Sequence, residues 1–206
     1  MSAGAAAVPK REAWGFAEVV VFVAGISTLG AEIAAARLVA PAFGASTVVW
    51  ANTIAVVLVA LAIGYAVGGR FADRHPHARG LALAALLGAA LIALIPLLAI
   101  PLLGATDDSL GEFSGSLVAQ LVLVLPPVVV LGALSPWAIR LRLKSVSAAG
   151  DVTGRLYALG TAGGLVGNFM ATLALIPLVG TRWTFLLCAV LLAAVSGPVA
   201  WFSKPA

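Results

Sequence analysis

The stretch GISTLGAEIAAARLVAPAFG, residues 25–44, determines how the rest of the sequence is interpreted. It belongs to the first long apolar run, yet it contains two ionised side chains, Glu32 and Arg37. An ionised side chain at the centre of a bilayer costs roughly 2.5–3.5 kcal/mol on insertion scales, and such residues usually have a partner or a functional role. We therefore expect the remaining helices to form a scaffold around this one.

The composition is that of an integral membrane protein. Of the 206 residues, 62% are hydrophobic and only 10% are charged, whereas soluble domains contain about 25% charged residues. The mean hydropathy is +1.12. The expected partner is therefore the lipid bilayer, and the net charge of +4 is interpreted as a signal of membrane orientation rather than of nucleic-acid binding. Cys188 is the only cysteine, so the chain has no disulfide framework.

Six stretches are long and apolar enough to span a bilayer, which takes about 20 residues. They cover residues 16–40, where Pro41 is expected to end the helix, and residues 46–68, 80–103, 116–139, 154–179 and 183–202. This pattern predicts an all-α polytopic protein with a transmembrane domain over residues 16–203 and a cytoplasmic tail over residues 1–15. Pro126 and Pro127 should bend the fourth helix. Residues 140–154 are expected to form a cytoplasmic loop or hinge between two three-helix halves, and no loop is long enough for a soluble domain.

Lysine and arginine residues gather on one side of the six predicted spans, namely Lys10, Arg11, Arg70, Arg74, Arg79, Arg140, Arg142, Lys144, Arg155 and Lys204. The other side has Asp107, Asp108, Glu112 and Arg182. Cytoplasmic loops of membrane proteins carry an excess of lysine and arginine. Both termini are therefore expected in the cytoplasm.

Four polar side chains from four predicted helices lie at comparable depth, namely Glu32, Asn52, Gln120 and Asn168. One interpretation is a substrate-binding pocket that is open to the outside, with Glu32 as its only carboxylate, which would suit a cation or an amine. The alternative is interhelical hydrogen bonding that stabilises the bundle, at about 0.6 kcal/mol for each contact. Arg37 lies five residues from Glu32 and therefore on another helix face. It is expected to have a structural role near the outer interface.

A second group of residues, Gly69-Arg-Phe-Ala-Asp73-Arg74, follows the second predicted span. Here Gly69 would allow close backbone approach, and Asp73 could pair with a neighbouring helix end and hold an inward gate shut. The alternative is an ordinary cationic loop. Gly64 with Gly68, and Gly163 with Gly167, have the spacing that lets helix backbones pack closely. The sequence contains no catalytic set, no metal-ligand cluster and no motif for a cofactor.

The segment from Gly69 to Arg74 is similar to the connection between helices two and three of major facilitator transporters, which reads G-x-x-x-D-R/K-x-G-R-R/K. Gly69, Asp73 and Arg74 match this pattern, whereas Pro76, His77 and Ala78 stand where it has glycine and two basic residues. The resemblance implies half of a major facilitator fold, with six helices arranged as two inverted three-helix repeats.

A broader resemblance covers most of the chain. Residues 30–74, the string LPPVVVLGALSPWAIRL at residues 125–141 and the string GRLYALGTAGGLVGNFMATLALIPLVGTR at residues 154–182 resemble the membrane domain of bacterial membrane-bound, fused spermidine synthases. The resemblance implies a location in the bacterial inner membrane. The aminopropyltransferase domain of that family has no counterpart in this sequence, so we expect no enzymatic activity.

Two functions remain open at this stage. The first is a half-size transporter that moves a small cationic amine or polyamine as a homodimer, with Glu32 as the counter-charge. The second is a membrane anchor or accessory subunit without transport, which would hold a separately encoded aminopropyltransferase-like enzyme or join a larger membrane complex. Its docking surface would be the basic stretch from Arg140 to Arg155.

Overall fold

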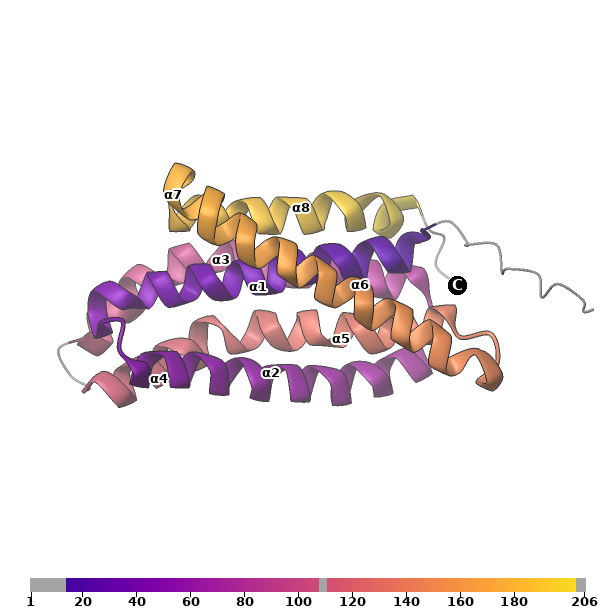
Figure 1. The fold of residues 1–206 in the computed structure, drawn as a ribbon, viewed down its shortest axis with the longest axis horizontal. Coiled ribbons are helices and arrows are strands. Elements are labelled where there is room, and N and C mark those ends of the chain that lie inside the picture. The colour runs from indigo at the N-terminus through magenta and orange to yellow at the C-terminus, as the bar shows by residue number, and fades with distance from the viewer. Residues whose placement is uncertain (1–13, 108–110, 203–206) are drawn as a thin grey trace, which may run out of the picture.

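The computed structural model describes residues 14–107 and 111–202, and within these ranges every regular element is a helix. The elements, in chain order, are α1 (Phe16–Phe43), α2 (Thr47–Arg74), α3 (Ala78–Asp107), α4 (Glu112–Leu123), α5 (Leu125–Arg142), the 3₁₀-helix η1 (Val146–Ala148), α6 (Ala149–Met170), the π-helix η2 (Ala171–Leu175), α7 (Ile176–Val179) and α8 (Thr181–Phe202). The helices lie side by side along the long axis of the molecule, and α6 crosses α1 obliquely (Figure 1). The predicted tail at residues 1–15 and the cations Lys10, Arg11 and Lys204 fall mainly or wholly outside the described residues.

Five helical segments are long and apolar enough to cross a membrane, and there are six if the bent pair α4 and α5 is counted as one span. This confirms the predicted all-α architecture with about six spans. The bend between α4 and α5 is 50° and lies at Val124, directly before Pro126 and Pro127. A proline cannot donate to the preceding turn and its ring collides with that turn, so a pair of prolines separates the span into two helices. The predicted bend of the fourth helix is therefore confirmed.

Three predicted boundaries are wrong. The first helix does not stop at Pro41 but continues to Phe43, because a proline in the last turn removes only one hydrogen bond. Gly44, whose φ is 79°, ends this helix while its N–H donates to the carbonyl of Ala40 at 2.8 Å. The segment of residues 69–74 is the last part of α2 rather than a loop. The expected hinge at residues 140–154 is reduced to residues 143–148, since α5 extends to Arg142 and α6 begins at Ala149.

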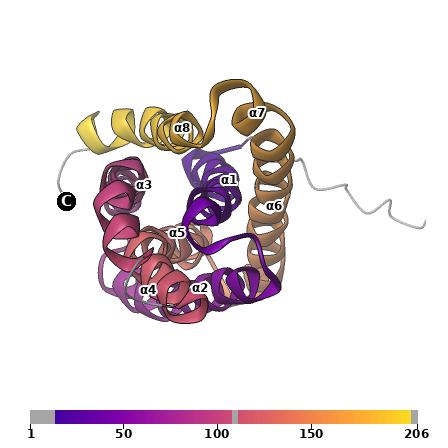
Figure 2. The same cartoon turned by 90° about the vertical axis from the view of Figure 1, so that its left-hand side faces the viewer.

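The end-on view places α1 at the centre of the bundle, surrounded by the other long helices (Figure 2). The most extensive contacts join α2 to α5, α1 to α6 and α3 to α8. These pairs bury a core of small and branched side chains, including Val20, Ala34, Ile92, Leu134 and Phe185. Because α1 packs against five of the other long helices, side chains on its different faces contribute to different helix interfaces.

Glycines allow α1 and α6 to approach each other closely. A Cβ atom at Gly163 would overlap the carbonyl oxygen of Phe22, and one at Gly167 would overlap the carbonyl oxygen of Ile26. The backbones of the two helices are therefore in contact where they cross. Such contacts are typical of small-residue seams between membrane helices, and they confirm the predicted close packing of this glycine pair.

The crossing of α2 and α5 has the same construction. A Cβ atom at Gly64 would overlap the carbonyl oxygen of Val129, and one at Gly68 would overlap the backbone of Ala133. Gly69 differs, because a Cβ atom there would meet only Pro136, at an ordinary contact distance of 3.9 Å. The prediction of a close backbone approach at Gly69 is therefore wrong. The close approach is made by Gly68 instead.

The exposed surface of α3 and α8 is apolar over the middle of both helices. Its exposed side chains are Leu83, Leu87, Leu94, Leu97, Leu98 and Ile100 on α3, and Leu187, Val190 and Leu191 on α8. Apart from Glu32 in the middle part of α1, the described charged residues lie toward the ends of the bundle. We call the end at which α1 begins the basic end, because it holds every described lysine and arginine except Arg37 and Arg182.

Candidate functional site

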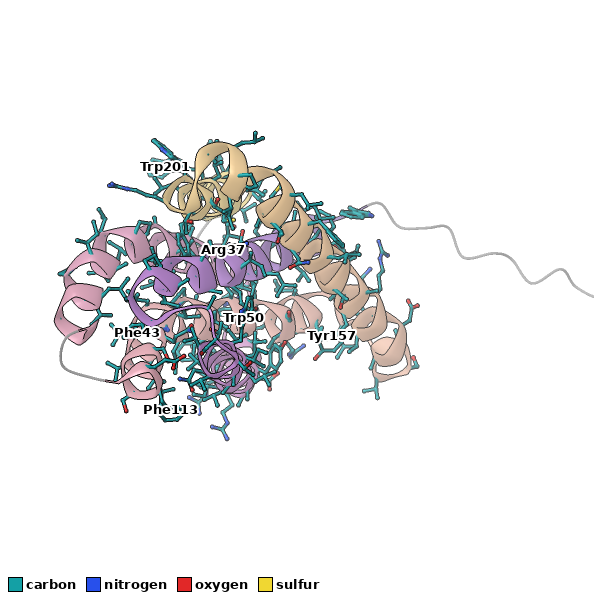
Figure 3. The ribbon with its side chains drawn as sticks, turned by 60° about the vertical axis from the view of Figure 1, so that its left-hand side comes forward. Arg37, Phe43, Trp50, Phe113, Tyr157 and Trp201 are labelled. Carbon is teal, nitrogen blue, oxygen red and sulfur yellow. The ribbon has the colours of Figure 1, made fainter. Side chains whose placement is uncertain are left out.

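A groove opens between α1, α2, α5 and α6, away from the apolar surface of α3 and α8. Its volume is about 270 Å³, close to the lower end of the range for small-molecule pockets, about 300–1,000 Å³. Glycine and aliphatic residues form most of its walls, and five side chains contribute hydroxyl groups, namely Thr28, Tyr65, Ser135, Tyr157 and Thr161. Tyr157 projects from α6 far along the bundle from Phe43 and Phe113, which mark the opposite end (Figure 3). The groove therefore lies in the half of the bundle nearer the basic end.

Only one of the five hydroxyl groups has a protein partner. Thr28 donates from Oγ1 to the carbonyl of Ala24, four residues earlier, at 2.7 Å. The hydroxyls of Tyr65, Ser135, Tyr157 and Thr161 make no hydrogen bond to any residue that the structure describes. Among the residues that the structure describes, no charged side chain lines the groove. The site is thus polar and uncharged, and its hydrogen-bonding capacity is available to water or to a ligand.

Glu32 and Asn168 lie just beyond the groove, on the helix faces that line it. Glu32 follows Thr28 by four residues on α1, and Asn168 follows Gly164 by four residues on α6. Four residues advance a helix by about 6 Å and return to the same face. Both side chains are half-buried, and neither has a hydrogen bond or ion pair among the described residues. The roles of Glu32 and Asn168 in substrate binding stay predictions. The structure shows in addition that an uncharged groove lies one helix turn away from both residues.

Asn52 and Gln120 lie elsewhere, in the interface between α2 and α4. Asn52 is buried and donates from Nδ2 to the hydroxyl of Ser116 at 2.9 Å and to the carbonyl of Phe113 at 3.0 Å. Gln120 is fully buried and donates from Nε2 to the hydroxyl of Thr53, which in turn donates to the carbonyl of Val49 at 2.9 Å. These contacts agree with the alternative of interhelical hydrogen bonding.

The structure therefore does not bring the four predicted polar residues together. Asn52 precedes the groove residue Leu61 by nine positions, which at about 100° per residue places it on the opposite face of α2. Depth along a helix can be estimated from sequence, but facing direction depends on which neighbour covers each side. Glu32 and Asn168 share one side of α1 and α6, whereas Asn52 and Gln120 join α2 to α4.

The residues predicted to form a gate have separate environments. Asp73 accepts an ion pair from Arg140 at the end of α5, with 3.2 Å between Oδ1 and Nε, as expected for pairing with a neighbouring helix end. Arg74 is exposed at the end of α2. Arg37 is exposed on α1, toward the end opposite the basic end (Figure 3).

The sequence analysis missed a second ion pair at the basic end. Glu18, with a side chain only 2% exposed, receives Arg142 Nη2 at 2.8 Å from its Oε1. Its Oε2 also accepts the backbone N–H of Gly15 at 3.1 Å, which caps the first turn of α1. A signal was present, since Glu18 is an acidic residue three positions after a glycine at the start of an apolar run. Arg140 and Arg142 thus tie the last turn of α5 to α2 and α1.

Within residues 14–107 and 111–202, no three His, Cys, Asp or Glu side chains are grouped so that they could hold a metal ion. Comparisons with protein-family models, with curated proteins and with solved structures give no significant match.

Proposed function

We propose that the chain is an integral membrane protein of six spans and that it works as a half-size, transporter-like unit in the bacterial inner membrane. The apolar exposed surface of α3 and α8 supports membrane insertion, because side chains that face lipid are apolar. The gathering of cations at the basic end supports a cytoplasmic position for that end and for both termini.

The pattern of helix contacts supports an arrangement of two three-helix repeats. Exchange of the first three spans with the last three turns the pair α2 and α5 into the pair α6 and α1, and these are the two most extensive contacts. The same exchange turns the contact of α1 with α8 into that of α3 with α4 and α5, both of which are present. Inverted repeats of this kind are typical of secondary transporters, whose binding sites lie near the repeat interface.

The proposed substrate is a small cationic amine or polyamine. The observation that carries this proposal is a half-buried carboxylate, Glu32, one turn beyond a polar and uncharged groove. An ionisable group at membrane depth generally faces a bundle interior or a water-filled cavity and marks a substrate path. The groove is bounded by one six-helix unit alone, so a homodimer would supply the opposing wall. No catalytic step is part of this proposal.

Uptake by the purified protein in proteoliposomes tests the proposal. Labelled 1,4-diaminobutane is offered to vesicles that contain the wild type, Glu32→Gln or Asp151→Asn. We expect Glu32→Gln to abolish uptake, because the amide keeps the shape of the side chain but removes its charge. Asp151→Asn is the control, since Asp151 is exposed in the first turn of α6 and should leave uptake unchanged. Equal uptake by the wild type and Glu32→Gln would refute the role of Glu32.

The exposed cations at the basic end favour a second candidate, a membrane anchor or accessory subunit. Arg70 and Arg74 are exposed and could dock an acidic surface of an aminopropyltransferase-like enzyme. The structure changes the choice of test residues, because Arg140 and Arg142 hold ion pairs within the bundle. A stoichiometric enzyme that co-purifies from native membranes and is lost with the Arg70→Gln, Arg74→Gln double variant would support the anchor. Co-purification that survives this double variant would count against docking there.

A further inference from the structure

The groove has four hydroxyl groups without a partner among the described residues. They belong to Tyr65 on α2, Ser135 on α5, and Tyr157 and Thr161 on α6. A hydroxyl group transferred from water to an apolar medium without a hydrogen bond costs several kcal/mol. Serine and threonine in helices can avoid this cost by bonding to the carbonyl four residues earlier, as Thr28 does. Ser135 and Thr161 do not make this bond.

The exposed surface of α3 and α8 differs from the groove in polarity. Over the middle of these helices the exposed side chains are apolar, as lipid tails require. On the groove side, Tyr65 and Tyr157 are 42% and 49% exposed and Thr161 is also exposed. Lipid tails over this side would leave four hydroxyl groups unsatisfied. Water or a polar ligand in the groove would satisfy them.

The phenol rings and the nearby carboxylate favour a cation among polar ligands. The free groups of the groove are hydroxyls, which both donate and accept hydrogen bonds, so their oxygens can accept from the three N–H donors of a primary ammonium group. The two phenol rings add surfaces that attract cations. An anion would find no cationic side chain in the lining and would lie about one helix turn from Glu32.

We propose that the groove is a water-filled ammonium-binding site, in which the hydroxyl oxygens of Tyr65, Ser135, Tyr157 and Thr161 accept hydrogen bonds from the ligand while Glu32 supplies the counter-charge one turn away. This inference rests on the proposed amine-binding function and identifies its contact residues. It assigns recognition of the ammonium group to neutral hydroxyls and leaves a single carboxylate to balance the charge.

Cysteine accessibility tests whether the groove is filled with water. The full chain is reconstituted in lipid vesicles as Thr161→Cys, with Ser135→Cys as a second groove variant. Leu87→Cys, on the exposed apolar surface of α3, is the control. The wild type gives the background, since its Cys188 is buried. The probe is a positively charged, water-soluble thiosulfonate reagent, added on both sides of the membrane. We expect both groove variants to react and Leu87→Cys to stay at background. Background reactivity of both groove variants would overturn the inference.

Protection by an amine tests the ligand class in the same samples. We expect 1,4-diaminobutane to slow modification of Thr161→Cys by about tenfold at saturation, while 1,4-butanediol, which has the same length and no charge, gives no protection. Equal effects of the two compounds would overturn the assignment to an ammonium group. Tyr65→Phe and Tyr157→Phe should each weaken this protection about two- to tenfold, as expected for the loss of one hydrogen bond.

The outcomes separate this inference from the proposed function. Uptake that depends on Glu32, with no amine protection of Thr161→Cys, would refute the groove as the binding site and leave transport standing. Protection of Thr161→Cys in a protein that shows no uptake would support the ammonium site and refute transport.

Discussion

Replacement of Gly163 by alanine should separate α6 from α1, the central helix of the bundle. A Cβ atom at this position would overlap the carbonyl oxygen of Phe22 and would lie 2.9 Å from the carbonyl carbon and 3.1 Å from the Cα atom of the same residue. Carbon atoms in favourable contact lie about 3.5–4.0 Å apart. The backbone of α1 cannot rotate away as a side chain can. Because the overlap with the carbonyl oxygen is the deepest of the three, α1 and α6 must move apart by about 1 Å or more.

The size of the effect follows from this displacement. A gap of about 1 Å removes roughly half of the dispersion attraction between the surfaces that it separates. Overpacking of this kind costs about 1–3 kcal/mol. Alanine is also a better helix former than glycine by about 0.8–1.0 kcal/mol, and this gain partly hides the cost. A matched variant is therefore needed to isolate the packing effect.

Two other glycines of α6 supply the controls. Gly154 has no atom within 4 Å of its would-be Cβ atom, and Gly160 would meet only a side-chain methyl of Val21, at 3.2 Å. Gly154→Ala gains the same helix propensity without a clash, so the difference between Gly163→Ala and Gly154→Ala is the packing cost itself. We expect this difference to be about 1–3 kcal/mol, with Gly160→Ala in between.

The quantity to measure is the free energy of unfolding of the three variants in mixed micelles. It is obtained by titration with sodium dodecyl sulfate and followed by tryptophan fluorescence. Stability should fall in the order Gly154→Ala, Gly160→Ala, Gly163→Ala. A Gly163→Ala protein as stable as Gly154→Ala would refute the backbone contact between α1 and α6.

The two ion pairs of α5 should differ in their contribution to the same free energy of unfolding. Glu18→Gln should cost about 1.5–3 kcal/mol, because it removes a charged hydrogen-bonding partner from Arg142 at a site where the Glu18 side chain is 2% exposed. A loss below about 0.5 kcal/mol, the upper end of the usual deviation from additivity in such comparisons, would contradict this role for Glu18. Asp73→Asn should cost less than about 1 kcal/mol, since the pair with Arg140 is exposed to solvent and screened. A larger loss of unfolding free energy for Asp73→Asn than for Glu18→Gln would show that burial does not determine how much each ion pair contributes.

The sequence predicted the helical class, the number of spans and the bend of the fourth helix, because these depend on local properties. Apolar runs of sufficient length specify spans, and Pro126 with Pro127 breaks a helix wherever it occurs. Helix ends were less predictable. Gly69–Arg74 is polar enough for a loop, yet its backbone continues α2, because Asp73 is paired with α5 and Ala72 is buried against the core.

The candidate site could be predicted only in part, because it depends on which helices face one another. Glu32 is conspicuous in any apolar run, whereas Tyr65, Ser135, Tyr157 and Thr161 are common residues of membrane helices. They become a group only when α2, α5 and α6 are placed around α1. The arrangement as inverted repeats and the resemblance to fused spermidine synthases remain predictions from the sequence.

The backbone contact of α1 with α6 has a consequence for biosynthesis. Phe22 and Gly163, which touch in the finished protein, are separated by about 140 residues of chain. At a translation rate of about 5–20 residues per second, the ribosome needs roughly 7–30 s between making one and making the other. During that interval α6 is not yet available to pack against the face of α1 that contains Phe22 and Ile26. A translocon or an insertion chaperone that shelters the nascent first helix would meet this need, and a slower supply of α6 would lengthen the time at risk.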